Sequence, residues 1–257
     1  MKPGIGLMWL VARGAALLLG SAIPAHVSIM GSTSVLPYLR AASAAFTEAH
    51  FPYRLTLGGG GSIAGLVEVS RGRVDMAVSD IPPTADWTHG VPLCHQPLGR
   101  QPILFIAHPG LVTDLSRGQL KNLLRGRIDN WSAVGGPKMP VTVVSRPLAS
   151  GSLRVVETQV LDGHRVTPKA IVMLSNGAVM AAVRESPGGL GFVESGRAPT
   201  GVTVLGIDHR RFDVSRPEGW PYYAVPTLYW RCPGNDSIRT VAHYLASQPF
   251  RREFGLY

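Results

Sequence analysis

Three short segments rich in glycine and small hydroxyl residues have the chemistry of an anion site. Each follows an extended pattern and precedes a helical one, and they read Gly31-Ser32-Thr33-Ser34, Gly58-Gly59-Gly60-Gly61-Ser62 and Ser150-Gly151-Ser152. A helix start exposes backbone N–H groups without helical partners, glycine lets the backbone approach a ligand closely, and hydroxyls add donors. One such segment alone is typical of an ordinary helix cap. Three in one chain favour a cage for an oxyanion.

Two charged residues at the ends of predicted strands indicate which kind of oxyanion such a site would bind. Arg146 follows the predicted strand 141–145 and stands four residues before Ser150, so its guanidinium can fork onto two anion oxygens. Asp80 follows the predicted strand 74–79, and its carboxylate only accepts hydrogen bonds. Such an acceptor favours an oxyanion that carries a proton, as phosphate does near neutral pH, over sulfate, which carries none. Taken singly, Arg146 is equally typical of a surface arginine and Asp80 of a turn.

The composition agrees with a folded, anion-binding protein. The chain has 257 residues, of which 45% are hydrophobic and 16% charged, so it can bury a sizeable core, and disordered, collagen-like and disulfide-scaffold classes are excluded. Lys and Arg number 25 against 16 acidic residues, which gives a net charge of +9 and favours an anionic partner. Most of the cations are arginines, which bind oxyanions in a bidentate manner.

Residues 1–25 have the pattern of a secretory signal peptide. Lys2 and Arg13 are followed by the apolar run 15–19 and by small residues up to Ala25, with no acidic residue. Arg13 splits the apolar stretch, which argues against a membrane anchor, and no cysteine follows for lipid attachment. We therefore expect cleavage near Ala25 and a periplasmic or secreted protein. Cys94 and Cys232 form either a disulfide or two buried free thiols.

Extended and helical patterns alternate along the rest of the chain, which predicts an α/β fold. The expected strands are 26–30, 53–57, 74–79, 102–107, 141–145, 190–193, 202–206 and 227–230, and the expected helices 35–49, 63–71, 152–161, 176–185, 237–246 and one capped by Ser116 with Gln119. We expect two lobes, each a mostly parallel sheet flanked by helices. Lobe 1 would comprise 26–106 and 205–257, lobe 2 would comprise 107–204, and hinge crossings would lie near Ile106 and Leu205. Ligands of such sheets bind at strand carboxyl ends.

Eight different motifs are spread over nearly all of the chain after residue 25. These are Gly31-Ser-Thr-Ser-Val35, Gly59-Gly-Gly-Ser-Ile-Ala-Gly65, Val74-Asp-Met-Ala-Val-Ser-Asp80, Leu115-Ser-Arg-Gly-Gln-Leu120, Gly126-Arg-Ile-Asp-Asn-Trp131 with Val134-Gly-Gly136, Arg146 through Ser152, Ser175-Asn176 and Pro187-Gly-Gly-Leu-Gly-Phe-Val193. In this order they resemble the phosphate-binding proteins of bacterial ABC phosphate importers, which have the type II periplasmic-binding-protein fold.

The resemblance implies a binding protein that does no chemistry and needs no cofactor or metal. Its two lobes would close over inorganic phosphate, and the complex would dock on an inner-membrane ABC permease. We expect a monomer and no nucleic-acid partner. The implied phosphate-binding residues are Thr33, Ser34, Ser62, Asp80, Arg146, Ser150, Gly151 and Ser152, with Asp80 accepting the phosphate proton and Arg146 pairing with phosphate and Asp80.

Three positions depart from the family pattern. Ser152 stands where threonine is usual, Pro147 stands where an acidic residue is common, and the glycine loop is one glycine longer. The basic surface and the missing lipid-anchor cysteine also suit a free periplasmic or secreted relative that scavenges or senses phosphate without a permease.

Other classes of function compete with this interpretation. Residues 59–64 fit the dinucleotide fingerprint, with Asp80 about 20 residues on, although an export leader disfavours a nicotinamide enzyme. A hydrolase would use Ser62 or Ser150 as nucleophile, but neither lies in G-x-S-x-G. Nucleic-acid binding is indicated only by charge, since no zinc spacing or RNA-binding motif accompanies the scattered cations.

Overall fold

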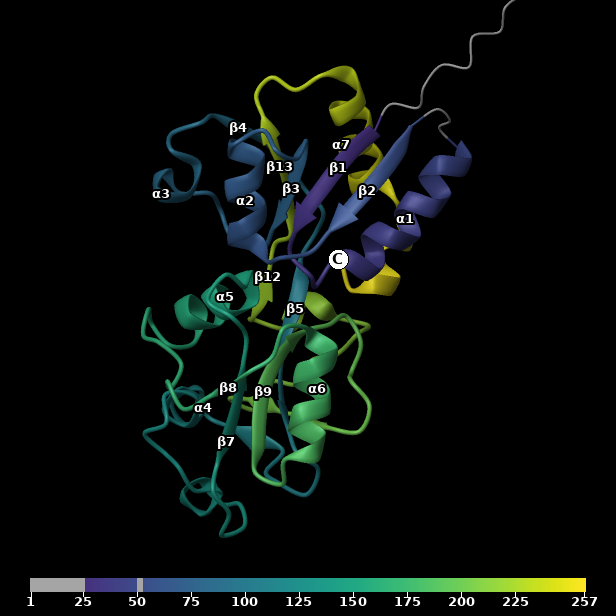
Figure 1. Cartoon of the computed structure of the whole chain (residues 1–257). Coiled ribbons are helices and arrows are strands. Elements are labelled where there is room, and N and C mark those ends of the chain that lie inside the picture. Colours follow the sequence, from purple (N-terminus) through teal and green to yellow (C-terminus); the bar gives the residue numbers. More distant parts are fainter. Residues whose placement is uncertain (1–25, 50–52) are drawn as a thin grey trace, which may run out of the picture.

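The computed structural model describes residues 26–49 and 53–257, and the predicted signal peptide lies outside this part. The residues described form two large sheets, each flanked by helices and each with its own core (Figure 1). We call residues 26–97 and 227–257 the first lobe and residues 101–224 the second lobe. No helix of the described residues is long and apolar enough to cross a membrane.

The sheet of the first lobe has the order β2-β1-β3-β13-β4. Its strands are β1 (His26–Gly31), β2 (Arg54–Gly58), β3 (Met76–Ser79), β4 (Leu93–Pro97) and β13 (Thr227–Arg231). β1 runs parallel to β2 and β3, whereas β13 runs antiparallel to β3 and β4. The carboxyl ends of β1, β2 and β3 therefore meet at one edge of the sheet.

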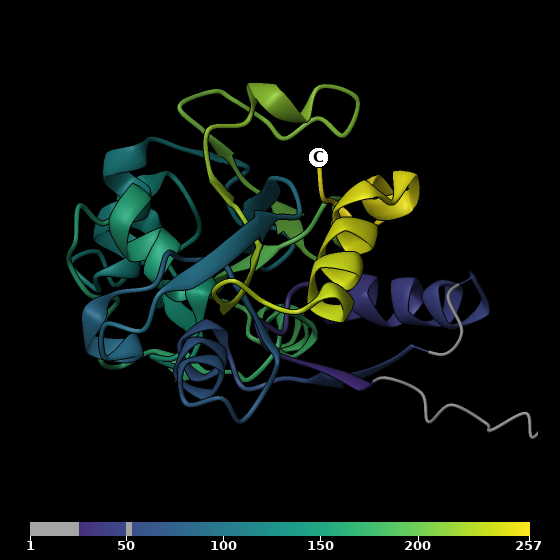
Figure 2. The same ribbon diagram turned by 90° about the horizontal axis from the view of Figure 1, so that it is seen from above.

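Helices cover both faces of this sheet because side chains alternate along its strands. On β3, Met76 and Val78 lie in the core that also holds α1 (Leu36–Ala49) and α7 (Asp236–Ser247). Ala77 faces the other way, in a smaller cluster with residues of α2 (Ser62–Ser70). The short α3 (Ala85–Thr88) packs beside α2, and the turn η3 (Pro249–Phe254) beside α1. Seen from above, α1 and α7 lie on the same side of β1 (Figure 2).

The sheet of the second lobe has the order β10-β5-β9-β7-β8, with β12 also paired to β5. The strands are β5 (Gln101–Ala107), β7 (Thr142–Ser145), β8 (Ile171–Val172), β9 (Gly189–Glu194), β10 (Thr203–Val204) and β12 (Tyr223–Ala224). Its helices are α4 (Arg117–Leu124), α5 (Gly151–Gln159) and α6 (Asn176–Glu185), with the turns η1 (Trp131–Val134) and η2 (Pro217–Gly219). A separate parallel pair joins β6 (Asp114–Leu115) and β11 (Gly206–Ile207).

The crossings between the lobes do not lie near Ile106 and Leu205, where the sequence analysis placed them. Ile106 is fully buried inside β5, which pairs with β9, β10 and β12 of the second sheet. Leu205 is also fully buried, in the core that contains Trp220 and Tyr222. Residues 101–106 and 205–224 thus belong to the second lobe, and the chain crosses at 98–100 and 225–226. The apolar side chains of 205–224 cover the second sheet, and this packing is why the segment belongs to the second lobe and not, as predicted, to the first.

The α/β class and the type of fold agree with the prediction, but the sheets are mixed. Each contains parallel and antiparallel pairs, because β13 and β5 adjoin the crossings and run against their neighbours. The helix predicted at 176–185 has the same bounds in the structure. The predicted capping box of Ser116 and Gln119 is present at α4.

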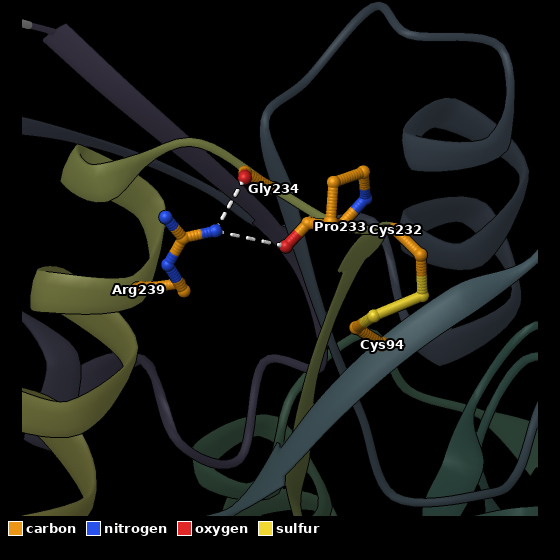
Figure 3. Close-up of a disulfide and its surroundings, with 5 residues drawn as sticks. All are labelled: Cys94, Cys232, Pro233, Gly234 and Arg239. Carbon is orange, nitrogen blue, oxygen red and sulfur yellow. Dashed lines mark hydrogen bonds between the residues drawn. A yellow bond between two sulfur atoms is a disulfide. The ribbon is translucent and has the colours of Figure 1, made fainter.

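A disulfide joins Cys94 to Cys232, with an S–S distance of 2.07 Å. It resolves the alternative that the sequence left open. Cys94 lies on β4 and Cys232 directly follows β13, so the bond connects two neighbouring strands of the first sheet (Figure 3). Nearby, Arg239 of α7 donates hydrogen bonds to the carbonyls of Pro233 and Gly234, at 3.3 and 2.7 Å. These contacts hold the turn between β13 and α7.

Candidate functional site

Asp80 lies at the carboxyl end of β3 and is held by two serines of the first lobe. Its Oδ2 accepts hydrogen bonds from Ser32 Oγ at 2.6 Å and from Ser62 Oγ at 3.0 Å. Its backbone N–H donates to Ser62 Oγ at 3.0 Å. Only 5% of Asp80 is exposed. The carboxylate is thus buried in a fixed orientation by hydroxyls that follow β1 and begin α2.

Glycine brings these segments within hydrogen-bonding distance. A Cβ at Gly31 would lie 2.0 Å from the carbonyl oxygen of Val78, and Gly31 has a φ of +146°. A Cβ at Gly65 would lie 2.6 Å from the carbonyl oxygen of Met30, so α2 packs directly on β1. A larger residue at either position would push the loop after β1 away from β3 or α2. The two glycines therefore set the spacing around Asp80.

Arg146 extends from the second lobe to the first. Its guanidinium donates to Thr33 Oγ1 at 3.0 Å across the lobes, and to Asn176 Oδ1 at 2.9 Å and the Leu174 carbonyl at 3.1 Å within its own lobe. The side chain is 5% exposed, and its Nε has no hydrogen-bond partner among the described residues. A buried guanidinium with an unused N–H is suited to a bound oxyanion.

The starts of α2 and α5 contact each other across the lobes. The Ile63 N–H donates to the Ala149 carbonyl at 3.3 Å. A Cβ at Gly151 would lie 2.4 Å from Ser62 Oγ and 2.5 Å from Asp80 Oδ2. No side chain caps either helix, and the Ser150 and Ser152 hydroxyls lie 3.3 Å apart. Two helix N-termini, each with a positive dipole end, therefore converge near the Asp80 carboxylate.

The structure brings all eight predicted site residues together. Together with Ser32 they make up nine residues that we call the interlobe cluster: Ser32, Thr33, Ser34, Ser62, Asp80, Arg146, Ser150, Gly151 and Ser152. Ser34 joins it through a 2.9 Å contact between its hydroxyl and that of Ser32. One expected contact is different, since Arg146 hydrogen-bonds to Thr33, Asn176 and Leu174 and not to Asp80.

Three further residues of this region were not among the predicted ligands. Ser32 lies in the first motif and donates to Asp80. Asn176 begins α6, accepts from Arg146 and donates to the backbone carbonyl of Glu194 at 2.9 Å. Glu194 ends β9 and is 4% exposed. An acidic residue directly after the apolar Leu190–Val193 run was the signal that could have identified Glu194.

Burial dominates the electrostatics of these charged groups. It raises the pKa of Asp80, against the Ser32 and Ser62 hydrogen bonds and the positive charge of Arg146, which lower it. Burial also raises the pKa of Glu194 to about 8, and the negative charge of Asp80 adds to this effect. The pKa of Arg146 is lowered by burial, while Glu194 and Asp80 oppose that shift. The region thus combines one guanidinium with two carboxyl groups that favour protonation.

A cavity of about 620 Å³ lies apart from the interlobe cluster. It is lined by residues next to the crossings and the chain end, among them Arg100, Trp220, Tyr223 and Tyr257. The Arg100 guanidinium stacks 3.5 Å from the centre of the Tyr223 ring. No residue of the interlobe cluster lines this cavity, so the cavity and the interlobe cluster are separate features of the molecule.

A family model described as a PBP superfamily domain matches residues 20–214. The chain belongs to the PBP superfamily. It is a family of solute-binding proteins rather than enzymes. The chain is 25% identical over 234 residues to the phosphate-binding protein PstS of Bacillus subtilis, covering 88% of this chain and 77% of the relative.

Solved structures of PBP-like proteins have the same fold. An ABC-type phosphate transport receptor from Vibrio cholerae has a TM-score of 0.73 at 22% identity, over 89% of this chain and 96% of that one. A structure with bound phosphate from Clostridium perfringens, described as an ABC transporter substrate-binding protein, has a TM-score of 0.79 at 21% identity, over 87% and 94%. The predicted fold is thereby confirmed.

Proposed function

We propose that this protein captures inorganic phosphate between its lobes and delivers it to an ABC importer. The observation that carries the proposal is the convergence of a buried guanidinium, a buried carboxylate and two helix N-termini from both lobes. Names of the relatives support it, since the Bacillus subtilis protein is a phosphate-binding protein and the Vibrio cholerae protein a phosphate transport receptor.

The chemistry of the interlobe cluster favours phosphate over sulfate. Arg146 and the N–H groups that begin α2 and α5 supply positive potential for an oxyanion. Asp80 would repel an anion unless that anion carries a proton for its carboxylate to accept. Phosphate meets this condition near neutral pH and sulfate does not. Thr33, Ser34, Ser62, Ser150 and Ser152 would add hydroxyl donors, and Gly151 would keep the backbone of α5 close.

Binding would require no chemical step and no cofactor. Micromolar affinity corresponds to about 8 kcal/mol, and charge-assisted hydrogen bonds contribute roughly 1.5–3 kcal/mol each. Several such bonds suffice once the cost of association is included. The alternatives of a hydrolase and a nicotinamide enzyme fit less well. Ser62 is engaged with Asp80, and a Cβ at Gly61 would lie 2.7 Å from the Ala149 carbonyl, so the second lobe covers the glycine loop.

The cellular role would follow from export. A signal peptide in residues 1–25 would send the chain to the periplasm, where a monomer would pass phosphate to an inner-membrane permease. A secreted form that scavenges or senses phosphate without a permease is the second candidate, and the net charge of +9 is compatible with it. Phosphate uptake by cells with and without the gene for this chain separates the two roles.

Replacement of Arg146 tests the binding proposal. Arg146→Ala removes the guanidinium and should reduce phosphate affinity by about a hundredfold or more, equivalent to about 3 kcal/mol, measured by isothermal titration calorimetry. Arg184→Ala, an exposed arginine on α6 of the same lobe, is the matched control and should leave affinity unchanged. Wild-type affinity in a folded Arg146→Ala protein would contradict the proposal.

A further inference from the structure

Glu194 is a second buried carboxyl group at the junction of the lobes. It is the last residue of β9, where it lies opposite Ile103 of β5. Its backbone carbonyl accepts from Asn176 Nδ2 at 2.9 Å, and Asn176 Oδ1 accepts from Arg146 at 2.9 Å. One asparagine thus fixes both the strand end that carries Glu194 and the guanidinium beside it.

The groups around the Glu194 side chain come from both lobes. The charged ones are Asp80, at the end of β3, and Arg146, at the end of β7. The hydroxyls of Ser34 and Ser152 lie near it and favour its charged form. Within the described residues, neither carboxyl oxygen of Glu194 has a hydrogen-bond partner. Only 4% of the residue is exposed, so water does not replace such a partner easily. A buried carboxyl group of this kind is suited to contact a ligand.

The charges of the region require a proton when an anion binds. With both carboxyl groups ionised, Asp80 and Glu194 carry two negative charges against the single positive charge of Arg146. An oxyanion between the lobes would add more negative charge, and a buried charge without a compensating partner is strongly unfavourable. A proton on one carboxyl group lowers this cost and supplies a donor for the anion.

Hydrogen bonding decides which of the two carboxyl groups holds that proton. Asp80 Oδ2 accepts from Ser32 and Ser62, and both bonds stabilise its ionised form. Ser34 and Ser152 lie near Glu194 and lower its pKa, but neither carboxyl oxygen of Glu194 has a hydrogen bond like the two that Asp80 Oδ2 accepts, and burial together with the nearby Asp80 charge raises its pKa. Glu194 is therefore the group that becomes neutral.

We infer that Glu194 is a specificity-determining residue that takes up a proton from solvent when phosphate binds and donates it in a hydrogen bond to a phosphate oxygen. This inference rests on the proposed function. Asp80 and Glu194 would then act in opposite directions, since Asp80 accepts a hydrogen bond from the phosphate O–H and Glu194 donates one to a phosphate oxygen. The only bond that forms is the O–H bond of the Glu194 carboxyl group, and it breaks again when phosphate leaves and the proton returns to solvent.

The sign of the pH dependence follows from the raised pKa. When the lobes are open and Glu194 contacts water, its pKa lies near the ordinary value of about 4.3. When they are closed, the pKa is about 8. Between these values binding takes up a proton, so affinity falls as pH rises, by up to about tenfold per pH unit. Below this pH range Glu194 is protonated in both the open and the closed state, so it does not change the affinity with pH.

Calorimetry of wild type and Glu194→Gln tests the inference. Phosphate binding is titrated in buffers of different ionisation enthalpy, which gives the number of protons taken up. Phosphate's own ionisation contributes equally to both proteins and cancels in the difference. We expect wild type to take up about one proton more than Glu194→Gln between about pH 5 and pH 8. The glutamine amide still donates to phosphate, so the variant should bind with affinity that falls less steeply with pH.

Two controls separate this effect from damage to the fold. Glu157→Gln replaces a buried glutamate that accepts from Arg154 and Arg165, outside the interlobe cluster, and should keep the wild-type proton uptake. If Glu194→Gln does not fold, wild type is titrated with sulfate at high concentration. Sulfate carries no proton in this range, and the same titration of Asp80→Asn removes the other buried carboxyl group, so the proton uptake that remains reports Glu194 and should stay near one.

The outcomes distinguish the inference from the proposed function. Wild type that binds no phosphate overturns both. Wild type and Glu194→Gln that bind phosphate with equal proton uptake overturn the role of Glu194 and leave phosphate capture standing. Sulfate binding without proton uptake by wild type would also overturn the role of Glu194 and leave phosphate capture standing.

Discussion

The two lobes contribute differently to the interlobe cluster. In the first lobe, Ser32 and Ser62 satisfy Oδ2 of Asp80 within the lobe itself. In the second lobe, Arg146 reaches across to Thr33, and both carboxyl oxygens of Glu194 are without partners among the described residues. Asp80 is thus held by loops of its own lobe, whereas Arg146 makes one of its three hydrogen bonds only when the lobes are closed. Changes that block closure should affect binding most.

Gly151→Ala should have the largest effect. The added Cβ would lie within 2.5 Å of Ser62 Oγ and Asp80 Oδ2, so the lobes could not close as they do here. Each lobe would still fold, because the clash arises only between them. We expect phosphate affinity to fall by about a hundredfold or more, as expected when a closed state is lost. Calorimetry gives the affinity, and small-angle scattering should show no compaction on addition of phosphate.

Gly177→Ala is the matched control for this prediction. Gly177 also lies near the start of a helix of the second lobe, and the nearest atom to an added Cβ is Ser175 Oγ at 3.9 Å. Affinity and compaction should remain at wild-type values. If Gly151→Ala also binds phosphate as wild type does, contact between the helix starts is not required for binding.

Asp80→Asn alters the first half of the cluster and should have a smaller, selective effect. The amide keeps one acceptor and gains a donor, so an anion without a proton is no longer repelled. We expect the preference for phosphate over sulfate to fall by roughly tenfold to a hundredfold, which corresponds to the loss of one charged hydrogen bond. Competition between the two anions measures the ratio. An unchanged ratio of phosphate to sulfate affinity would show that Asp80 does not determine the selectivity.

Joint replacement of Cys94 and Cys232 by serine should have the smallest effect on binding. The bond lies beyond the end of β13, whereas Thr227 at the start of β13 pairs with Ser79 beside Asp80. We expect phosphate affinity within about twofold of wild type and a free energy of unfolding lower by about 2–4 kcal/mol. Chemical denaturation measures the second quantity. A large loss of affinity would mean that the bond positions the cluster.

The comparison between lobes also shows what sequence could predict. Asp80, Ser62 and Arg146 end strands or begin helices, and local patterns are sufficient to place such residues at one edge of a sheet. The bounds of α6 follow from its N-cap serine and its periodicity. For Glu194 the local signal is only an acidic residue after an apolar run, and its place near Asp80 depends on β9 lying between β5 and β7. The crossings were misplaced for a related reason, since no local signal shows that Trp220 packs under the second sheet.

The position of the disulfide has a consequence for how the chain survives damage. Cys94 precedes and Cys232 follows residues 101–224 in the sequence. The disulfide therefore closes a covalent loop that contains the whole second lobe. A protease that cuts one exposed turn of this loop, such as Gly163–His164, would leave both fragments attached to each other. The nicked molecule would migrate as one species under denaturing conditions until a reductant is added.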